Sequence, residues 1–266
     1  MSHSVARRGL TTLAEVRGTI VSCQRCTRLR DYCQRVACEK KKAYRDETYW
    51  ARPVPGFGDV RARILVLGLA PAAHGANRTG RVFTGDGVGG SGDFLMAALY
   101  RAGFANIPTS HRPDDGLRLR DVFIAAAVRC APPDNKPLPE EIAACASHLD
   151  AEVAALARLQ VVVALGHIAW RAWLDHLARR GLSIRPRPAF GHGIFMNPST
   201  RRTGPARTSA FRTSPVHPGT SAPPHLGTGM VALVGCYHPS RQNTNTRKVT
   251  PAMYDEVFAR VSRLLR

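Results

Sequence analysis

The chain has 266 residues, 44% of them hydrophobic, so it is long enough to bury a core and is not expected to be disordered. Thirty-eight Lys and Arg residues against nineteen Asp and Glu give a net charge of +19, which favours a polyanionic partner such as nucleic acid. The sequence lacks the run of about 20 apolar residues that spans a bilayer, and no apolar segment follows its charged amino terminus, so we expect a cytoplasmic protein without a membrane partner.

The first sixty residues are polar, basic and rich in cysteine, with one short helix expected at 13–21. An apolar run that ends at a glycine then predicts a buried strand at 61–68. A helical period follows at 92–103, with Ser91 as a candidate N-cap. The same alternation predicts strands at 121–128, 160–166 and 230–235, and helices at 139–159, from 167 to about 180, and at 251–265.

Apolar strands that alternate with helices indicate one α/β domain, residues 1–266, whose parallel sheet is covered on both faces. Sites in such sheets lie at the carboxyl ends of the strands. Residues 197–229 are rich in Pro, Gly, Ser, Thr and Arg, which predicts a flexible basic insertion. The stretch between Asp175 and Asp255 has eleven Arg and Lys residues and no acidic residue, which strengthens the expectation of a nucleic-acid partner.

Seven cysteines in a reducing compartment are not expected to form disulfides. Four thiolates from two separated segments could hold a metal group and tie residues 1–60 to the core: Cys23, Cys26, Cys130 and Cys145. A local quartet would instead resemble a small zinc site: Cys23, Cys26, Cys33 and Cys38. All seven could also be small buried hydrophobic residues. Spacing alone leaves the three interpretations open.

Two polar loops follow predicted strands. The loop 68–86 is rich in glycine and contains one aromatic residue, Phe83, but it lacks the patterns of a P-loop and of a dinucleotide-binding turn. The loop 237–246 contains His238 followed by Pro239, which favours an extended backbone that directs the histidine into a cleft. From the residues alone, a structural histidine and a functional one are about equally plausible.

Three segments resemble the motifs of family 5 (type b) uracil-DNA glycosylases, the iron–sulfur branch of that superfamily: GLAPAAHGANRTGRVFTGD at 68–86, VRCAPPDNKP at 128–137 and YHPSRQNTNT at 237–246. The similarity runs from about Cys23 to His192 and resumes at Met230. The resemblance implies a three-layer α/β/α sandwich around a four-stranded parallel sheet. It also implies a monomeric repair enzyme that hydrolyses the N-glycosidic bond of uracil and other deaminated bases, such as hypoxanthine and xanthine, and leaves an abasic site. The substrate implied is double-stranded DNA, with single-stranded DNA left open.

The resemblance also implies roles for individual residues. Phe83 would stack on the flipped base, with Gly68 and Asn77 beside it, and His238 would donate a hydrogen bond to the base oxygen. Asn135 would position water, and Asp86 would orient water or stabilise the cationic sugar. The DNA-contacting residues would be Ser240, Arg241, Gln242 and Asn243. The ligands of a 4Fe-4S cluster would be Cys23, Cys26, Cys130 and Cys145. Simpler interpretations are core packing for Phe83 and a turn or helix cap for Asp86.

Two losses relative to other branches of the superfamily point to a broad base specificity. Apolar residues, Leu69, Ala70 and Ala72, follow the first-strand glycine, and Ala126 takes the place of a base-reading asparagine. An apolar pocket with few fixed hydrogen bonds rejects the wrong base weakly. Two departures from the family are the long segment 197–229 and Arg247, which stands where a glycine commonly ends the third motif.

Two other functions remain open from the sequence. A non-catalytic protein that binds damaged DNA could keep the fold and the cluster. A zinc-stabilised RNA-binding module would use the local cysteine quartet. Iron content would distinguish the zinc-stabilised RNA-binding module from the glycosylase. Base release would distinguish the non-catalytic damage-binding protein from it.

Overall fold

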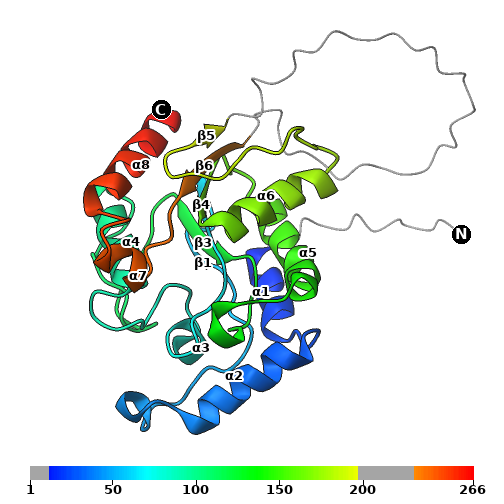
Figure 1. Cartoon of the computed structure of the whole chain (residues 1–266), viewed down its shortest axis with the longest axis vertical. Helices are drawn as coiled ribbons and strands as arrows, with labels where there is room; N and C mark the ends of the chain where they lie inside the picture. The colour runs from blue at the N-terminus through cyan, green and yellow to red at the C-terminus, as the bar shows by residue number, and fades with distance from the viewer. Residues whose placement is uncertain (1–11, 197–230) are drawn as a thin grey trace, which may run out of the picture.

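A six-stranded sheet in the order β1-β3-β2-β4-β6-β5 lies at the centre of the computed structural model, which describes residues 12–196 and 231–266 (Figure 1). Its four inner strands are parallel and buried along their whole length: β2 (Ile64–Gly68), β3 (Val122–Ala126), β4 (Val161–Leu165) and β6 (Ala232–Cys236). The predicted parallel sheet is therefore confirmed. Each edge also carries a two-residue antiparallel strand, β1 (Phe57–Gly58) and β5 (Phe195–Met196), too short to leave a pattern in the sequence.

Helices cover both faces of the sheet because alternate strand residues point to opposite sides. In β2, Ile64 and Val66 pack into one core with α4 (Ser91–Arg101) and α8 (Pro251–Leu264), whereas Leu65 and Leu67 pack into the other. The second core is closed by α5 (Pro139–Ala155) and α6 (His167–Arg179). The three-layer α/β/α sandwich expected from the sequence is thus present (Figure 1).

The shorter helices lie around the ends of this sandwich. They are α1 (Leu13–Val21), α2 (Thr27–Glu39), η1 (Lys42–Tyr44), α3 (Ala76–Thr79), η2 (Pro133–Asn135) and α7 (Arg241–Asn245). The helix α2 was missed in the sequence, although its buried residues Leu29, Cys33 and Val36 recur at helical spacing. None of the described helices has the length and apolar composition needed to cross a membrane.

Helix boundaries differ from the predictions by a few residues, and two of the differences have a clear local reason. The helix predicted at 139–159 stops at Ala155, because Leu156 leaves the helical region with φ −87° and ψ 72°. Ser91 is the first residue of α4 rather than its N-cap, which is Gly90. The predicted basic insertion, 197–229, lies outside the described residues.

A buried ion pair joins the amino-terminal segment to the sandwich. Arg129, which follows β3, donates from Nη2 to Oε2 of Glu152 in α5 at 2.7 Å, and the two side chains are 1% and 3% exposed. The other oxygen of Glu152 accepts the backbone N–H of Gly56 at 2.8 Å. One carboxylate thus holds together the segment before β1, the end of β3 and helix α5.

Glu152→Gln should lower the free energy of unfolding by about 3–5 kcal/mol, because it leaves the buried Arg129 guanidinium without its counter-charge. The measurement is urea unfolding followed by circular dichroism. Arg112→Gln is the matched control: it breaks the exposed pair between Arg112 and Asp114, which contributes little to stability. Equal effects of the two substitutions would contradict a dominant role for the buried pair.

Candidate active site

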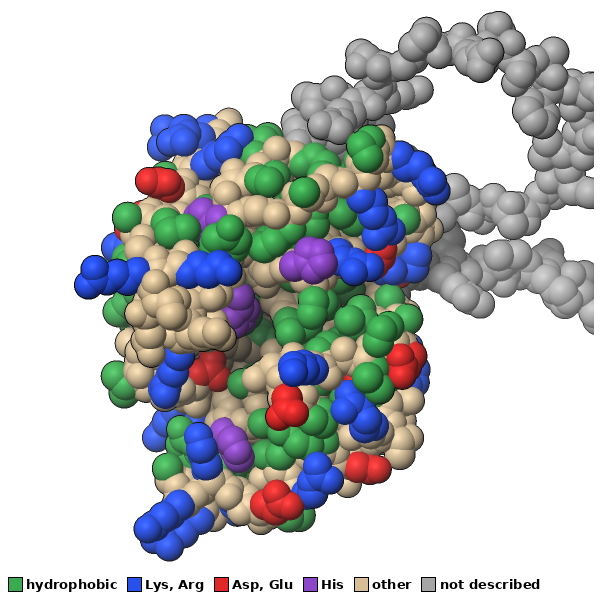
Figure 2. Space-filling view, viewed as in Figure 1, with side chains coloured by type: hydrophobic (Ala, Val, Ile, Leu, Met, Phe, Trp, Pro, Cys, Tyr) green, Lys and Arg blue, Asp and Glu red, His purple; other side chains and the backbone are tan. Residues whose placement is uncertain are grey.

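A cleft of about 1000 Å³ opens at the carboxyl ends of the parallel strands. Its walls come from the loop after β2, the loop after β3, the start of α6 and the loop after β6. Figure 2 shows a hollow near the middle of one face, with Lys and Arg side chains around it. The structure brings Phe83, Asp86, Asn135, His238, Ser240 and Arg241 together as lining residues of this cleft.

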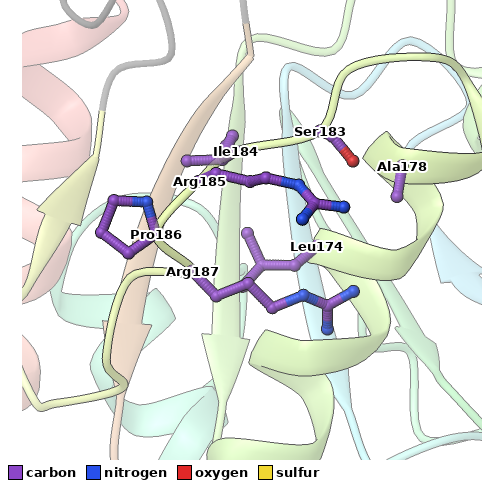
Figure 3. Close-up of a pocket in the computed structure, with 7 residues that line it drawn as sticks. All are labelled: Leu174, Ala178, Ser183, Ile184, Arg185, Pro186 and Arg187. Carbon is purple, nitrogen blue, oxygen red and sulfur yellow. The ribbon is translucent and has the colours of Figure 1, made fainter.

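A second, smaller pocket of about 400 Å³ lies between the carboxyl-terminal half of α6 and the loop that follows it (Figure 3). Its lining residues are Leu174, Ala178, Ser183, Ile184, Arg185, Pro186 and Arg187. The charged groups among them are two exposed arginines, and Arg187 is already paired with Asp175 at 2.7 Å. None of the predicted site residues lies in this pocket, whereas six of them line the larger cleft.

Phe83 stands at the floor of the cleft in a strained backbone conformation. Its φ of 51° lies in the left-handed region, which residues other than glycine rarely adopt. Such backbone conformations are often found at functional sites. Its ring lies 5.7 Å from the ring of His238 at an angle of 32°. A Cβ atom on Gly68 would stand 2.9 Å from Cε2 of Phe83, so the glycine that ends β2 makes room for this ring.

Asp86 is half-buried, and its carboxyl lies against the backbone of Gly75. A Cβ atom on Gly75 would stand 1.9 Å from its Oδ1, so a larger residue at that position would displace the carboxylate. Burial raises the pKa of the Asp86 carboxyl to about 6, and the Gly92 N–H and the Arg241 guanidinium oppose this only in part. Gly90 occupies the N-cap position of α4, and the Asp86 carboxyl faces the N–H of Gly92 in the first turn of the same helix.

His238 lies just beyond the end of β6. Burial lowers the pKa of its imidazole to about 4, so the ring is neutral at pH 7 and has one N–H to donate. Its backbone carbonyl accepts from Nδ2 of Asn243 at 2.8 Å. The ring is therefore a neutral hydrogen-bond donor whose backbone is held from within its own loop.

The predicted DNA-contacting run forms the start of α7. Ser240 caps this helix by accepting the N–H of Asn243 at 3.3 Å. Gln242 is exposed, and Arg241 donates from Nη2 to the backbone oxygen of Asp86 at 3.2 Å, which joins the third motif to the first. Arg247 has a φ of 56°, in the left-handed region that favours glycine, so the departure from the third motif falls where the backbone itself suits a glycine.

Asn135 and Asn77 lie in different surroundings. Asn135 is exposed at the mouth of the cleft in η2, and it and Asp134 both have left-handed φ values, 56° and 52°. Asn77 is fully buried, and its Nδ2 donates to the backbone oxygens of Cys33 and Ala73, each at 3.3 Å. The structure therefore places Asn77 beneath the cleft, where it joins α3 to α2, and not among the lining residues.

Four cysteines from distant segments gather beside the cleft. Cys26 packs against Cys130 and Cys145 in a small apolar cluster that also contains Cys33. Burial, followed by the charges of Cys145, Cys130 and Cys23, raises the pKa of the Cys26 thiol to about 11. Cys38 is exposed, and Cys236 is buried in the core beside α8. The structure thus brings together the quartet drawn from two segments, with Cys33 beside it, whereas Cys38 of the local quartet is exposed and outside this cluster.

One wall of the cleft was missed in the sequence. It comes from the amino-terminal segment and consists of Tyr32, Lys41 and Tyr44. Tyr49 supports it, with its hydroxyl 3.0 Å from Nδ1 of His74 in the first motif. Aromatic and basic residues in alternation are typical of surfaces that bind single-stranded nucleic acid, and this pattern could have indicated the wall.

Comparison with known proteins identifies the family. The model of the Uracil DNA glycosylase superfamily matches residues 55–262. The type-5 uracil-DNA glycosylase of Mycobacterium tuberculosis is 44% identical over 257 residues, which cover 96% of this chain and 83% of the relative. That of Thermus thermophilus is 44% identical over 92% of this chain and 95% of the relative, and that of Pyrobaculum aerophilum is 39% identical over 91% and 89%. The chain therefore belongs to the uracil-DNA glycosylase superfamily and, within it, to the family of type-5 uracil-DNA glycosylases.

Proposed function

We propose that this chain is a DNA repair glycosylase that flips uracil out of double-stranded DNA and hydrolyses its N-glycosidic bond, leaving an abasic site. The observation that carries the proposal is the arrangement of Phe83, His238 and Asp86 around one cleft: an aromatic ring, a neutral hydrogen-bond donor and a carboxylate. A base inside a duplex is out of reach, so the nucleotide must enter this cleft from outside the stack.

His238 is proposed to stabilise the leaving base. As the glycosidic bond breaks, negative charge develops on the base oxygen, and a donor already in place lowers the energy of that state. The buried neutral imidazole is suited to this task because burial has already removed water from its N–H, so no solvent has to be displaced before it donates. Phe83, held 5.7 Å away, would stack on the base and present it to that donor.

Asp86 and Asn135 are proposed to act on the sugar and the attacking water. The sugar becomes cationic as the bond breaks, and an ionised carboxylate stabilises such a charge. Asn135, at the mouth of the cleft, carries an amide that can orient a water molecule. Ser240, Arg241 and Gln242 lie at the cleft or on its exposed rim and are proposed to contact the DNA.

We extend the proposed substrates to hypoxanthine and xanthine. Leu69, Ala70 and Ala126 line the cleft with apolar side chains. Such a wall makes few fixed hydrogen bonds to a base edge and so discriminates weakly between deaminated bases. We further propose that the protein acts in the cytoplasm, on the nucleoid, as a monomer.

The cysteine quartet is proposed to hold a 4Fe-4S cluster. The described residues include no set of three or more His, Cys, Asp or Glu spaced for a single ion. A four-iron cluster needs a wider spacing, because each thiolate binds a different iron.

Buried cations beside the thiols suit an anionic group. The positive charge of Arg30 favours the thiolate form of Cys130, and that of Arg129 favours the thiolate form of Cys145. Three nitrogens of these two arginines are buried without a protein partner: Arg30 Nη1, Arg129 Nε and Arg129 Nη1. Buried N–H groups without partners are rare, and a negatively charged cluster would satisfy them. When bound, the cluster would cross-link the amino-terminal segment to α5 and to the loop after β3.

His238→Ala should slow base release from a uracil-containing duplex by about a hundred- to a thousand-fold, the usual cost of one donor to a developing anion. Affinity for abasic DNA should stay close to that of the unsubstituted protein. The measurements are single-turnover release at saturating enzyme and a binding titration. His111→Ala, an exposed histidine outside the cleft lining, is the control. Near-normal release by His238→Ala would refute this role, and tight binding of abasic DNA without turnover in the unsubstituted protein would favour a non-catalytic damage sensor.

The rate of base release should rise with pH through about 6 and then level off, because Asp86 has a pKa raised to about 6 and acts in its ionised form. His238, with a pKa of about 4, stays neutral across this window and does not contribute to the change. Asp86→Asn should be slow and should lack the inflection. The measurement is the pH profile of single-turnover release between pH 5 and 8, and an unchanged inflection in Asp86→Asn would assign it to another group.

The purified protein should be brown and contain about four irons per chain. Cys145→Ser should lose the iron, whereas Cys236→Ser, which alters a buried cysteine in a different core, should keep it. The measurement is iron analysis together with the visible absorbance. A colourless protein with stoichiometric zinc would contradict the cluster.

A further inference from the structure

The backbone that leads to His238 is held by side chains from two other parts of the chain. The last ladder bond of β6 runs from the N–H of Gly166 to the oxygen of Cys236 at 2.8 Å. Beyond it, the N–H of Tyr237 donates to Nδ1 of His192 at 3.2 Å, and the oxygen of Tyr237 accepts from the hydroxyl of Tyr254 at 2.8 Å. We propose that His192 and Tyr254 are positioning residues that fix the backbone of Tyr237 and thereby direct the ring of His238 into the cleft.

This inference rests on the role proposed for His238. Both backbone polar groups of Tyr237 are bonded, and the next carbonyl, that of His238, accepts from Asn243 at 2.8 Å. Pro239, which follows His238, restricts the backbone of the histidine further. The backbone from which the imidazole projects is therefore fixed by bonds on both sides of it.

Tyr254 is a buried anchor in α8. Its side chain is fully buried, and its ring meets that of Phe94 edge-on at 5.0 Å. A hydroxyl carried into the interior is costly unless it is bonded, and its partner here is the carbonyl that precedes His238. The carboxyl-terminal helix thus fixes a peptide group of the active-site loop.

His192 is held in register with β6. The N–H of Gly193 donates to the oxygen of Gly235, and the N–H of Gly235 donates to the oxygen of Ile194, both at 2.8 Å. A Cβ atom on Gly235 would stand 2.3 Å from the oxygen of Gly191, so a glycine in β6 is required for this close approach. The ring of His192 then lies 5.3 Å from the ring of Tyr237.

The hydrogen bond from Tyr237 requires His192 in one form. Its Nδ1 can accept only when that nitrogen carries no proton, so the ring is neutral with its proton on Nε2. Burial keeps the pKa of His192 below its usual range, which favours this form. An asparagine can offer its Oδ1 as an acceptor in a similar place, whereas a leucine cannot.

The experiment measures single-turnover release of uracil from a duplex at saturating enzyme for Tyr254→Phe, His192→Leu and His192→Asn. Displacement of a reacting group by about 1 Å can cost a hundred-fold in rate, so we expect Tyr254→Phe and His192→Leu to be about ten- to a hundred-fold slower. His192→Asn should recover most of the rate. Affinity for abasic DNA should stay within roughly twofold for all three, because a docked DNA still meets the same surface.

The same substitutions are then made in the His238→Ala background. If His192 and Tyr254 act through the His238 ring, Tyr254→Phe and His192→Leu should each cost no more than roughly twofold there. Val261→Ala is the control: it alters another fully buried side chain of α8 and should have the same small effect in both backgrounds. Thermal unfolding of each variant reports any general loss of stability.

Equal losses in the two backgrounds, or full rates for Tyr254→Phe and His192→Leu, would overturn the positioning role alone. Near-normal release by His238→Ala would overturn the proposed function of His238 and this inference with it. Losses confined to proteins that retain the His238 ring, with recovery in His192→Asn, establish the positioning role.

Discussion

The parallel pairing of β2, β3, β4 and β6 is the constraint on which the site depends. Parallel strands end at the same edge of a sheet, so the loops that follow them meet even when they are far apart in the chain. Register places Gly68 beside Ala126 and Leu165 beside Cys236. The first and third motifs therefore face each other across the ends of β2, β4 and β6, and Phe83 comes within 5.7 Å of His238.

Burial acts in opposite directions on the two titratable groups of this cleft. It raises the pKa of the Asp86 carboxyl to about 6 and lowers that of the His238 imidazole to about 4, because in each case it disfavours the charged form. Near neutral pH the carboxyl is ionised and the imidazole is neutral. In the proposed mechanism, the same low-polarity surroundings would supply a negative charge for a cationic sugar and an uncharged donor for a leaving base.

Arginines also attach the amino-terminal segment to the sandwich. Arg25 donates to the backbone oxygen of Ala144, Arg28 pairs with Glu141, and Arg30 donates to the oxygen of Ala51. The first two partners lie on α5, the helix that carries Cys145. These contacts bring the Cys23 and Cys26 segment to Cys145, so part of the basic charge that suggested nucleic acid serves internal pairing instead.

Local patterns of polarity and spacing were enough to predict the alternation of strands and helices, the three motifs at strand ends and, as one of several options, the grouping of Cys23 and Cys26 with distant cysteines. They did not place Asn77 beneath the cleft, bring Tyr32 to its wall, or reveal His192 and Tyr254 behind the loop of His238. These positions follow from the folded chain alone, since each depends on contacts between segments separated by many residues. The same holds for the chemistry of Asp86 and His238: their residue types are visible in the sequence, but their pKa values are set by the protein that surrounds them.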